Sequence, residues 1–357
     1  MIANLTLRKL IQAAERGVKV VLIIEHLNFY LKHSLYKELK KKGGIIIAPN
    51  PVTKILTNIM NSNTVKTWNR YHQKVSLIDS DLFVGSINIA EEYSDIKYGT
   101  NKFVDLNIYV KNTICKNKVL RFFREILLEN TDQIPQSNLG KIEQLFDELK
   151  IDSDINDVIE DRVEEFLEEL PPKKSEVQDK IYDLLASSKD SILIIQSYYL
   201  NLKKIEDLII SAVKRGVKVQ VVTGVIRDQT AYRHIYNSDL FANLLNNGVE
   251  VYEYMDNVLH VKAYYVDNKV LTLGSLNNDI TSFSMNNEAN YLVKRNSKND
   301  DMFEDFEFLV KELKKNSKRV NLYDYKNFFR LSQSYFWYGF LNLMEKTGAG
   351  RKIKYDK

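Results

Sequence analysis

Two stretches of the chain carry a histidine, a lysine and an aspartate at the same spacing, His-x-Lys-x4-Asp, and each is followed by Gly-Ser-x-Asn. The candidate site residues are His72, Lys74, Asp79, Ser86 and Asn88 in the first stretch, and His260, Lys262, Asp267, Ser275 and Asn277 in the second. Chance would place Lys and Asp in this way after a given histidine with a probability of roughly 0.02, and the chain has only 5 histidines. The repetition indicates a site assembled from two equivalent halves.

This spacing suits chemistry on phosphate. Residues two apart on a strand face the same side, so each histidine projects together with its lysine. Each aspartate then falls at a hairpin turn, where we expect it to fix the turn by hydrogen bonds to the backbone. Where the two sets meet, one imidazole can attack phosphorus while the other protonates the leaving alkoxide, and the cationic and polar groups surround the phosphate.

The segments that must position these residues are also repeated. Residues 5–24 and 202–222 each read as an amphipathic helix, a glycine that ends it and a buried strand. A second helix–strand unit follows in each half, at residues 35–47 and 240–252. A helix followed by a buried strand is half of a βαβ unit. The sequence therefore predicts a duplicated α/β fold, with mixed β-sheets flanked by helices and the active site at the pseudo-twofold interface.

The repeat also suggests domain boundaries: a first domain at 1–130, an acidic helical linker at 131–172, a second domain at 173–324 and an aromatic amphipathic tail at 325–357. Helices are expected in the linker at 139–149 and 158–170, as a solvated connection rather than a lid. The second half opens with a helix at 177–187 and a strand at 191–199, whose counterparts would precede Met1. Either another segment fills that place or the chain is truncated, and we favour truncation because an unpaired sheet position is costly.

Composition excludes several classes of protein. With 51 Lys and Arg against 47 Asp and Glu, the net charge is only +4, so a nucleic-acid partner is not indicated. No apolar run approaches the about 18 residues of a membrane span. The single Cys115 cannot close an intrachain disulfide and reads as a buried small hydrophobe. His26, His33 and His234 fit no metal-ligand spacing.

The paired motifs resemble those of the phospholipase D superfamily, and longer stretches resemble its cardiolipin synthase branch. The stretches that carry this resemblance are residues 85–93, 103–105, 248–262 and 279–290. Two departures stand out. The turn between Asp79 and Gly85 is one residue shorter than usual, and the N-terminal membrane-spanning region of many bacterial members is missing from this sequence.

The resemblance implies a covalent phosphohistidine mechanism that needs no metal and no cofactor. It makes His72 the nucleophile and His260 the acid and then the base, in an order that sequence does not fix. The groups it places on the phosphate oxygens are Lys74, Lys262, Asn88 and Asn277, with Ser86 and Ser275 in support. It also implies a carboxylate behind each imidazole: Glu288 for His260, and Asp105 for His72.

The activity that the resemblance implies is transfer of a phosphatidyl group, most simply between two molecules of phosphatidylglycerol. Water as the acceptor would give phosphatidic acid instead, and the further alternatives are a nuclease and an inactive lipid-binding relative. The implied partners are a phospholipid substrate and a membrane surface, in the bacterial plasma membrane or the mitochondrial inner membrane of a eukaryote. The aromatic segment 325–344 would lie on lipid or pack on the second domain. No oligomeric state is indicated.

Overall fold

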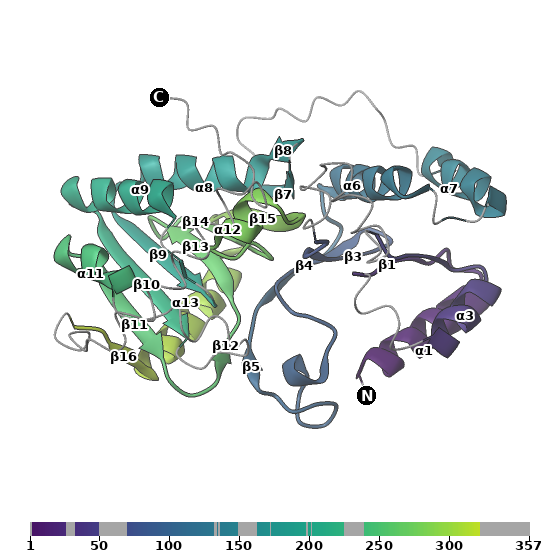
Figure 1. Ribbon diagram of the computed structural model, residues 1–357, viewed down its shortest axis with the longest axis horizontal. Coiled ribbons are helices and arrows are strands. Elements are labelled where there is room, and N and C mark those ends of the chain that lie inside the picture. The colour runs from purple at the N-terminus through teal and green to yellow at the C-terminus, as the bar shows by residue number, and fades with distance from the viewer. Residues whose placement is uncertain are drawn as a thin grey trace, which may run out of the picture.

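The structure is a computed structural model that describes residues 2–25, 33–49, 70–131, 134, 136–148, 163–171, 173–197, 199–200, 202–224 and 239–321. Helices and strands are interspersed along the chain, and helices flank the sheets, of which the largest is mixed (Figure 1). The predicted fold class is confirmed. The aromatic segment 325–344, His26 and His234 lie outside the described residues, as does the side chain of His33.

The second half of the chain is built on a nine-stranded sheet in the order β16-β11-β10-β9-β13-β14-β15-β7-β8. Strands β9, β10 and β11 run parallel, and the other neighbouring pairs run antiparallel. The strand bounds are β7 Glu164–Leu170, β8 Lys174–Ser175, β9 Ser191–Gln196, β10 Lys218–Gly224, β11 Glu250–Tyr254, β13 Lys262–Val266, β14 Val270–Gly274, β15 Glu288–Lys294 and β16 Ser317–Arg319.

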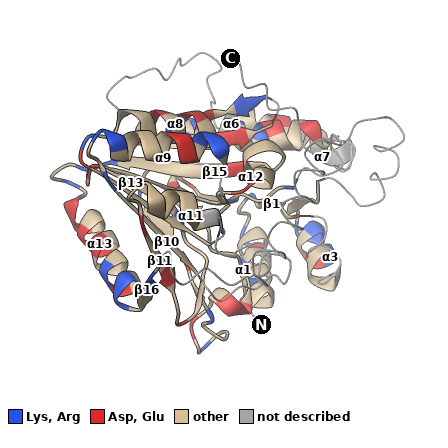
Figure 2. Ribbon diagram, turned by 60° about the vertical axis from the view of Figure 1, so that its left-hand side comes forward, with Lys and Arg blue, Asp and Glu red and all other residues tan. Residues whose placement is uncertain are grey.

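Helices cover both faces of this sheet. One face packs against α8 (Glu176–Ser187), α9 (Lys203–Lys214), α11 (Asp239–Asn246) and α12 (Ile280–Ser284), whose apolar residues share one buried cluster with it. The other face packs against α13 (Asp300–Lys315). Charged residues colour α8, α9 and α13 in Figure 2, as expected for amphipathic helices that bury one side.

The first half repeats these elements in smaller sheets. Helix α1 and strand β1 correspond to α9 and β10, and glycines with positive φ, Gly17 at 89° and Gly216 at 90°, end the two helices. The bounds are α1 Ile2–Glu15, β1 Val21–Ile23, α3 His33–Lys41, β2 Ile45–Ile47, β3 Lys74–Ile78, β4 Asp81–Gly85, the 3-10 turn η2 Glu91–Tyr93, β5 Phe103–Val104, β6 Asn107–Val110, α6 Lys116–Glu129 and α7 Gln136–Glu148. The helix predicted near 139–149 is confirmed as α7.

Among the described residues, the first half has two sheets that are not joined by hydrogen bonds. Strands β1 and β2 pair with each other in parallel, while β3, β4 and β6 form a separate antiparallel sheet. In the second half, β9 lies between β10 and β13 and joins the equivalent pieces into one sheet. Within the described ranges, no strand occupies the corresponding place between β1 and β3.

The helix predicted at 158–170 is wrong for the residues that the structure describes. Glu164–Leu170 is strand β7, paired antiparallel with β15. The sequence Glu-Glu-Phe-Leu-Glu-Glu-Leu has good helix formers, but in the sheet Phe166 and Leu167 reach opposite faces and are both buried. Pairing with a central strand and burial on both faces override local propensity here.

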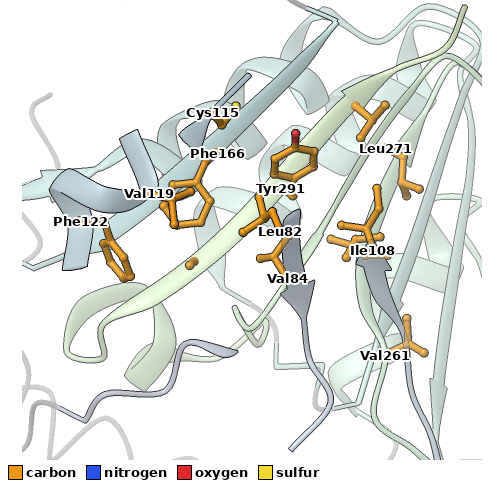
Figure 3. Packing of buried hydrophobic residues seen from close by; sticks show 14 of the residues in the cluster. Leu82, Val84, Ile108, Cys115, Val119, Phe122, Phe166, Val261, Leu271 and Tyr291 are labelled. Carbon is orange, nitrogen blue, oxygen red and sulfur yellow. The ribbon is translucent and has the colours of Figure 1, made fainter. Parts of the chain in front are cut away.

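A shared hydrophobic core joins the two halves. Leu82, Val84 and Ile108 of the first half lie in the same cluster as Leu271 and Tyr291 of the second (Figure 3). The predicted burial of Cys115 is confirmed, because it lies in this cluster and is 2% exposed. Packing across the halves fixes how the two motif-bearing strand pairs face each other.

Gly274→Ala is expected to destabilise the protein strongly. A Cβ at this position would lie 2.2 Å from Asn290 Oδ1 and 2.3 Å from the carbonyl oxygen of Ala289, because β14 and β15 meet closely there. We expect a loss of about 3 kcal/mol in the free energy of unfolding by guanidinium denaturation. Gly140→Ala in α7 is the matched control, since a Cβ there meets nothing within 4 Å. A loss no larger than that of the control would contradict the close approach.

Candidate active site

The first histidine is held by the second half of the chain. A parallel bridge joins Tyr71 to Asn287, and the backbone N–H of His72 donates to the carbonyl oxygen of Asn287 at 3.0 Å. This pairing places the His72 ring beside Glu288, whose carboxylate oxygens lie 2.8 and 2.9 Å from Nδ1. The His72 side chain is 27% exposed, while that of Glu288 is fully buried.

The second histidine is held by the first half in the same way. Strand β12 (Val258–Leu259) pairs in parallel with β5, and the backbone N–H of His260 donates to the carbonyl oxygen of Val104 at 2.8 Å. His260 Nδ1 then lies 2.7 Å from Asp105 Oδ2. The two motifs are therefore brought together by a reciprocal exchange of strand pairs, which supports the predicted pseudo-twofold site.

The predicted partners of the two imidazoles were exchanged. The pairing drawn from the resemblance was Glu288 with His260 and Asp105 with His72, but the structure pairs Glu288 with His72 and Asp105 with His260. The reason is that the segment before each histidine pairs with the segment that leads into the other half's carboxylate. Each carboxylate accepts a hydrogen bond from Nδ1–H, which fixes the tautomer and leaves the Nε2 lone pair for chemistry.

The two lysines lie beside their own histidines. Lys262 is 1% exposed, and its Nζ lies 2.6 Å from the carbonyl oxygen of His260 and 3.2 Å from Nε2. Lys74 is partly buried and donates to the carbonyl oxygen of His72. Burial lowers the pKa of Lys74 to about 8, against the opposing attraction of Glu288 and Asp105. Both lysines can place positive charge where an anionic phosphate would bind.

Burial and charge keep His260 neutral at physiological pH. Burial first, and then the Lys262 ammonium, lower the pKa of His260 to about 4, although Asp105 acts in the opposite direction. Burial raises the pKa of Glu288, but His72 and Lys74 outweigh it, so the pKa is lowered and the carboxylate stays ionised. A bound phosphate would offset the lysine charge and favour the protonated imidazole.

The two serines form hydrogen bonds at or next to the carboxylates that bind the histidines. Ser86 Oγ donates to Asp105 Oδ1, and Ser275 Oγ accepts from the backbone N–H of Ala289 at 3.0 Å, next to Glu288. Their predicted supporting role therefore fits histidine orientation, while a direct contact with phosphate stays a prediction.

The two asparagines follow these serines and take part in local hydrogen bonds. Asn88 Nδ2 donates to the hydroxyl of Tyr93 at 2.9 Å, and Asn277 Oδ1 accepts from Ser197 Oγ at 3.1 Å. Register pairs Lys74 with Gly85 and Ala263 with Leu273, so both asparagines follow the strand ends that lie opposite the histidine ends of β3 and β13. Their contact with phosphate stays a prediction.

The structure does not bring Asp79 and Asp267 to the histidine pair. Both lie at turn positions with positive φ, 55° and 54°, at the far ends of β3 and β13. Asp267 accepts from the backbone N–H groups of Lys189, Asp190 and Ser191, at 2.7–3.1 Å. Partial burial raises the pKa of Asp267, but these bonds outweigh it, and the pKa is lowered. This geometry supports a structural role.

Sequence reasoning missed an aromatic wall beside His260. The rings of Tyr93 and Phe103 stack at 4.5 Å between centroids, and both meet the His260 ring edge-on, at 5.1 and 5.8 Å. Both residues belong to the stretches that carry the family resemblance, but that resemblance gave neither of them a role. The wall limits how the imidazole can rotate and excludes water from one side of it.

A second missed residue is Glu169 of β7, which lies directly opposite Glu288 in the sheet and is fully buried. Its Oε2 accepts from the backbone N–H of Gln178 at 3.1 Å. Burial first, with the charges of Asp179 and Glu288, raises the pKa of Glu169 to about 8. A protonated carboxyl therefore lies behind the carboxylate that orients His72.

Glu169→Gln is expected to stabilise the protein in a pH-dependent way. Between the ordinary value of 4.5 and about 8, the unfolded chain releases a proton that the folded chain keeps. The contribution of Glu169 to the free energy of unfolding therefore falls as pH rises through this window. We expect the variant to exceed the parent by roughly 1–3 kcal/mol at pH 8 and by less at pH 5, measured by denaturant unfolding. Glu165→Gln, whose carboxylate pairs with Lys180, is the control. A pH-independent difference would contradict the assignment.

Comparison with known proteins identifies the family that this chain resembles. Residues 181–310 match the family described as "Cardiolipin synthase, PLD-like domain". Among similar proteins are the cardiolipin synthases of Halalkalibacterium halodurans, 27% identical over 83% of this chain and 56% of that protein, and of Alkalihalophilus pseudofirmus, 27% identical over 91% and 61%. The chain thus spans about three-fifths of the length of these relatives.

Solved structures show the same fold. The crystal structure of phosphatidylserine synthase from Haemophilus influenzae aligns with a TM-score of 0.65 over 96% of this chain and 92% of that one, at 13% identity. At this identity the likeness concerns the fold alone. The sequence matches confirm the family resemblance that the paired motifs indicated.

Proposed function

We propose that this chain, which is similar to cardiolipin synthases and matches their phospholipase D-like domain at residues 181–310, is a phosphatidyltransferase of the cardiolipin synthase type. Its donor would be phosphatidylglycerol and its acceptor an alcohol, most simply the glycerol headgroup of a second phosphatidylglycerol. The similarity to cardiolipin synthases supports the substrate class, and the arrangement of the two histidines supports the chemistry.

The observation that carries the proposal is the reciprocal pairing of the two imidazoles with buried carboxylates. Asp105 and Glu288 each hold Nδ1–H of one histidine, so both rings present Nε2 in a site that also contains Lys74 and Lys262. Two oriented imidazoles allow one to act as a nucleophile while the other moves protons.

In the proposed reaction, His72 Nε2 forms a bond to phosphorus while the bond from phosphorus to the glycerol oxygen breaks. His260 gives a proton to the departing oxygen, which leaves as glycerol. The acceptor hydroxyl then gives its proton to His260 and attacks the phosphatidyl-histidine, releasing His72 and forming the new phosphodiester. The lysines would offset the charge on the non-bridging oxygens. If the two histidines exchanged roles, the same bonds would form and break and the same protons would move.

A membrane surface is the proposed location of this reaction, since the lipids proposed as substrates reside there. Within the part of the chain that the structure describes, no helix has both the length and the apolar character needed to cross a bilayer. We propose that the described domains meet the membrane at its surface, where the headgroups of these lipids lie.

The test is incubation of the purified protein with phosphatidylglycerol vesicles in glycerol-free buffer, with the lipids read by mass spectrometry. Cardiolipin and free glycerol are expected, and both should disappear in His72→Ala. Phosphatidic acid without cardiolipin would show that the protein is a hydrolase and not a transferase. The absence of any lipid product from a protein shown to be folded by circular dichroism would overturn the proposal.

A further inference from the structure

Two buried carboxyl groups lie next to each other behind His72. In the antiparallel pair of β7 and β15, Glu169 lies directly opposite Glu288, so the two side chains leave the sheet on the same face with Cβ atoms about 5 Å apart. Both residues are fully buried. Because Glu288 binds His72 Nδ1 at 2.8–2.9 Å, Glu169 is the direct neighbour of the carboxylate that orients this imidazole.

The geometry allows only one of these two groups to be ionised, since adjacent buried carboxylates repel each other. Glu288 has His72 and Lys74 as positive neighbours, which outweigh its burial and lower its pKa. Glu169 Oε2 accepts from the backbone N–H of Gln178, but Oε1 has no hydrogen-bond partner in the part of the chain that the structure describes. A buried ionised oxygen without a donor is costly, so the proton stays on Glu169.

The groups around Glu169 add negative charge. Helix α8 packs on β7 and β15 (Figure 1). After burial, the charges of Asp179 on α8 and of Glu288 raise the pKa of Glu169 further. Asp279, the N-cap of α12, is also buried, and burial and then Glu288 raise its pKa. The described lysines near this end of β7 pair with other carboxylates: Lys174 with Glu168, and Lys118 with Glu176.

The carboxylate behind the other histidine has different neighbours. Asp105 Oδ2 binds His260, and Oδ1 accepts from Ser86 Oγ and from the backbone N–H of Leu106. These two donors are neutral groups whose charge does not follow pH. Among the contacts that the structure describes, a titratable acid opposite the orienting carboxylate therefore belongs to the His72 side.

The charge behind His72 matters for the second step of the proposed reaction. The ring of phosphatidyl-histidine is positive, because Nε2 is bonded to phosphorus and Nδ1 keeps its proton. When the acceptor oxygen bonds to phosphorus, the P–N bond breaks, its electron pair returns to Nε2 and the acceptor proton goes to His260. The ring loses its positive charge in this step. A second anion behind the ring would stabilise the charged intermediate and slow the transfer.

We propose that Glu169 is a positioning residue that, by keeping its proton, leaves Glu288 as the single anion behind His72 and so allows the phosphatidyl group to leave the ring. Glu169 acts through Glu288 and not on the substrate. Once Glu169 is ionised, the intermediate is stabilised and turnover falls. This inference rests on the proposed function.

Nitrogen-15 shifts of the histidine rings test the charge coupling without substrate. As pH rises through the range around 8 in which Glu169 loses its proton, the His72 ring nitrogens should shift, and Glu169→Gln should lose this step. Lys74 titrates in the same range but remains in the variant, so the step that is lost belongs to Glu169. Glu165→Gln on the same strand, whose carboxylate pairs with Lys180, is the control and should titrate as the parent does. Identical titrations in the parent and Glu169→Gln would overturn the proposal.

Turnover of phosphatidylglycerol vesicles tests the consequence for transfer. The turnover of Glu169→Gln, divided by that of the parent, should rise about tenfold between about pH 7 and about pH 9, because roughly nine-tenths of Glu169 is ionised at the higher pH. At that pH, mass spectrometry should find more phosphatidyl adduct on His72 in the parent than in the variant. Circular dichroism checks that both proteins are folded.

The two measurements separate the possible failures. A ratio of turnovers that does not change with pH would overturn the role of Glu169 in transfer, even if the His72 ring still follows Glu169. A folded parent that forms no lipid product at any pH would instead contradict the proposed function. The ring titration would then still show whether Glu169 controls the charge behind His72.

Discussion

His72→Ala and His260→Ala are each expected to lower the rate of phosphatidyl transfer by at least about a thousandfold, because each removes one of two groups that act as a unit. The two variants should differ when the leaving group is p-nitrophenolate, which departs without a proton. A lipid p-nitrophenyl phosphodiester should then give His260→Ala one equivalent of nitrophenolate per chain before it stalls. His72→Ala should give no such burst.

The burst also identifies the nucleophile. Mass spectrometry of the stalled His260→Ala protein should find the phosphatidyl adduct on the peptide that contains His72. A burst in His72→Ala, with the adduct on His260, would exchange the two roles. Near-parental transfer of phosphatidylglycerol by either variant would contradict the two-histidine mechanism. Phe308→Ser on the surface of α13 controls for nonspecific effects of substitution.

The local elements and the repeat could be predicted from sequence because their signals are local. Helix periodicity, the glycines that end α1 and α9, and the alternation after each histidine depend on neighbouring residues. The positions of His72 and Lys74 on one strand end, and of His260 and Lys262 on another, follow from the same short spacing. Such patterns say which residues share a face, but they do not say which strands meet.

The features that sequence reasoning missed depend on contacts between distant segments. The pairing of β5 with β12, and of Tyr71 with Asn287, decides which carboxylate faces which imidazole. Strand β7 has the composition of a helix and becomes a strand because β15 offers it an edge. Asp105 and Glu288 were found from the resemblance, but a single sequence holds no information about this exchange of strands.

Asp105→Asn and Glu288→Gln are the sharpest tests of this exchanged pairing, and each is expected to lower turnover by about a hundred- to ten-thousandfold. The amide keeps the shape of the carboxylate, but it no longer stabilises an imidazolium and can select the wrong tautomer. Asp207→Asn, an exposed carboxylate on α9, is the matched control for loss of one negative charge. A loss below about tenfold in both site variants would remove the carboxylates from the mechanism.

Nitrogen-15 chemical shifts of the histidine rings show which carboxylate serves which imidazole without any substrate. Asp105→Asn should change the ring nitrogens of His260 and leave those of His72 near their parental positions, while Glu288→Gln should do the reverse. The hydrogen bond to Asp105 raises the pKa of His260 against burial and Lys262, so the pKa of this ring should fall below its value of about 4 in Asp105→Asn. Changes at His72 in Asp105→Asn instead would contradict the exchanged pairing. The ring shifts are measured without substrate. They would therefore show whether each half orients the histidine of the other even if this chain acts on a substrate other than phosphatidylglycerol.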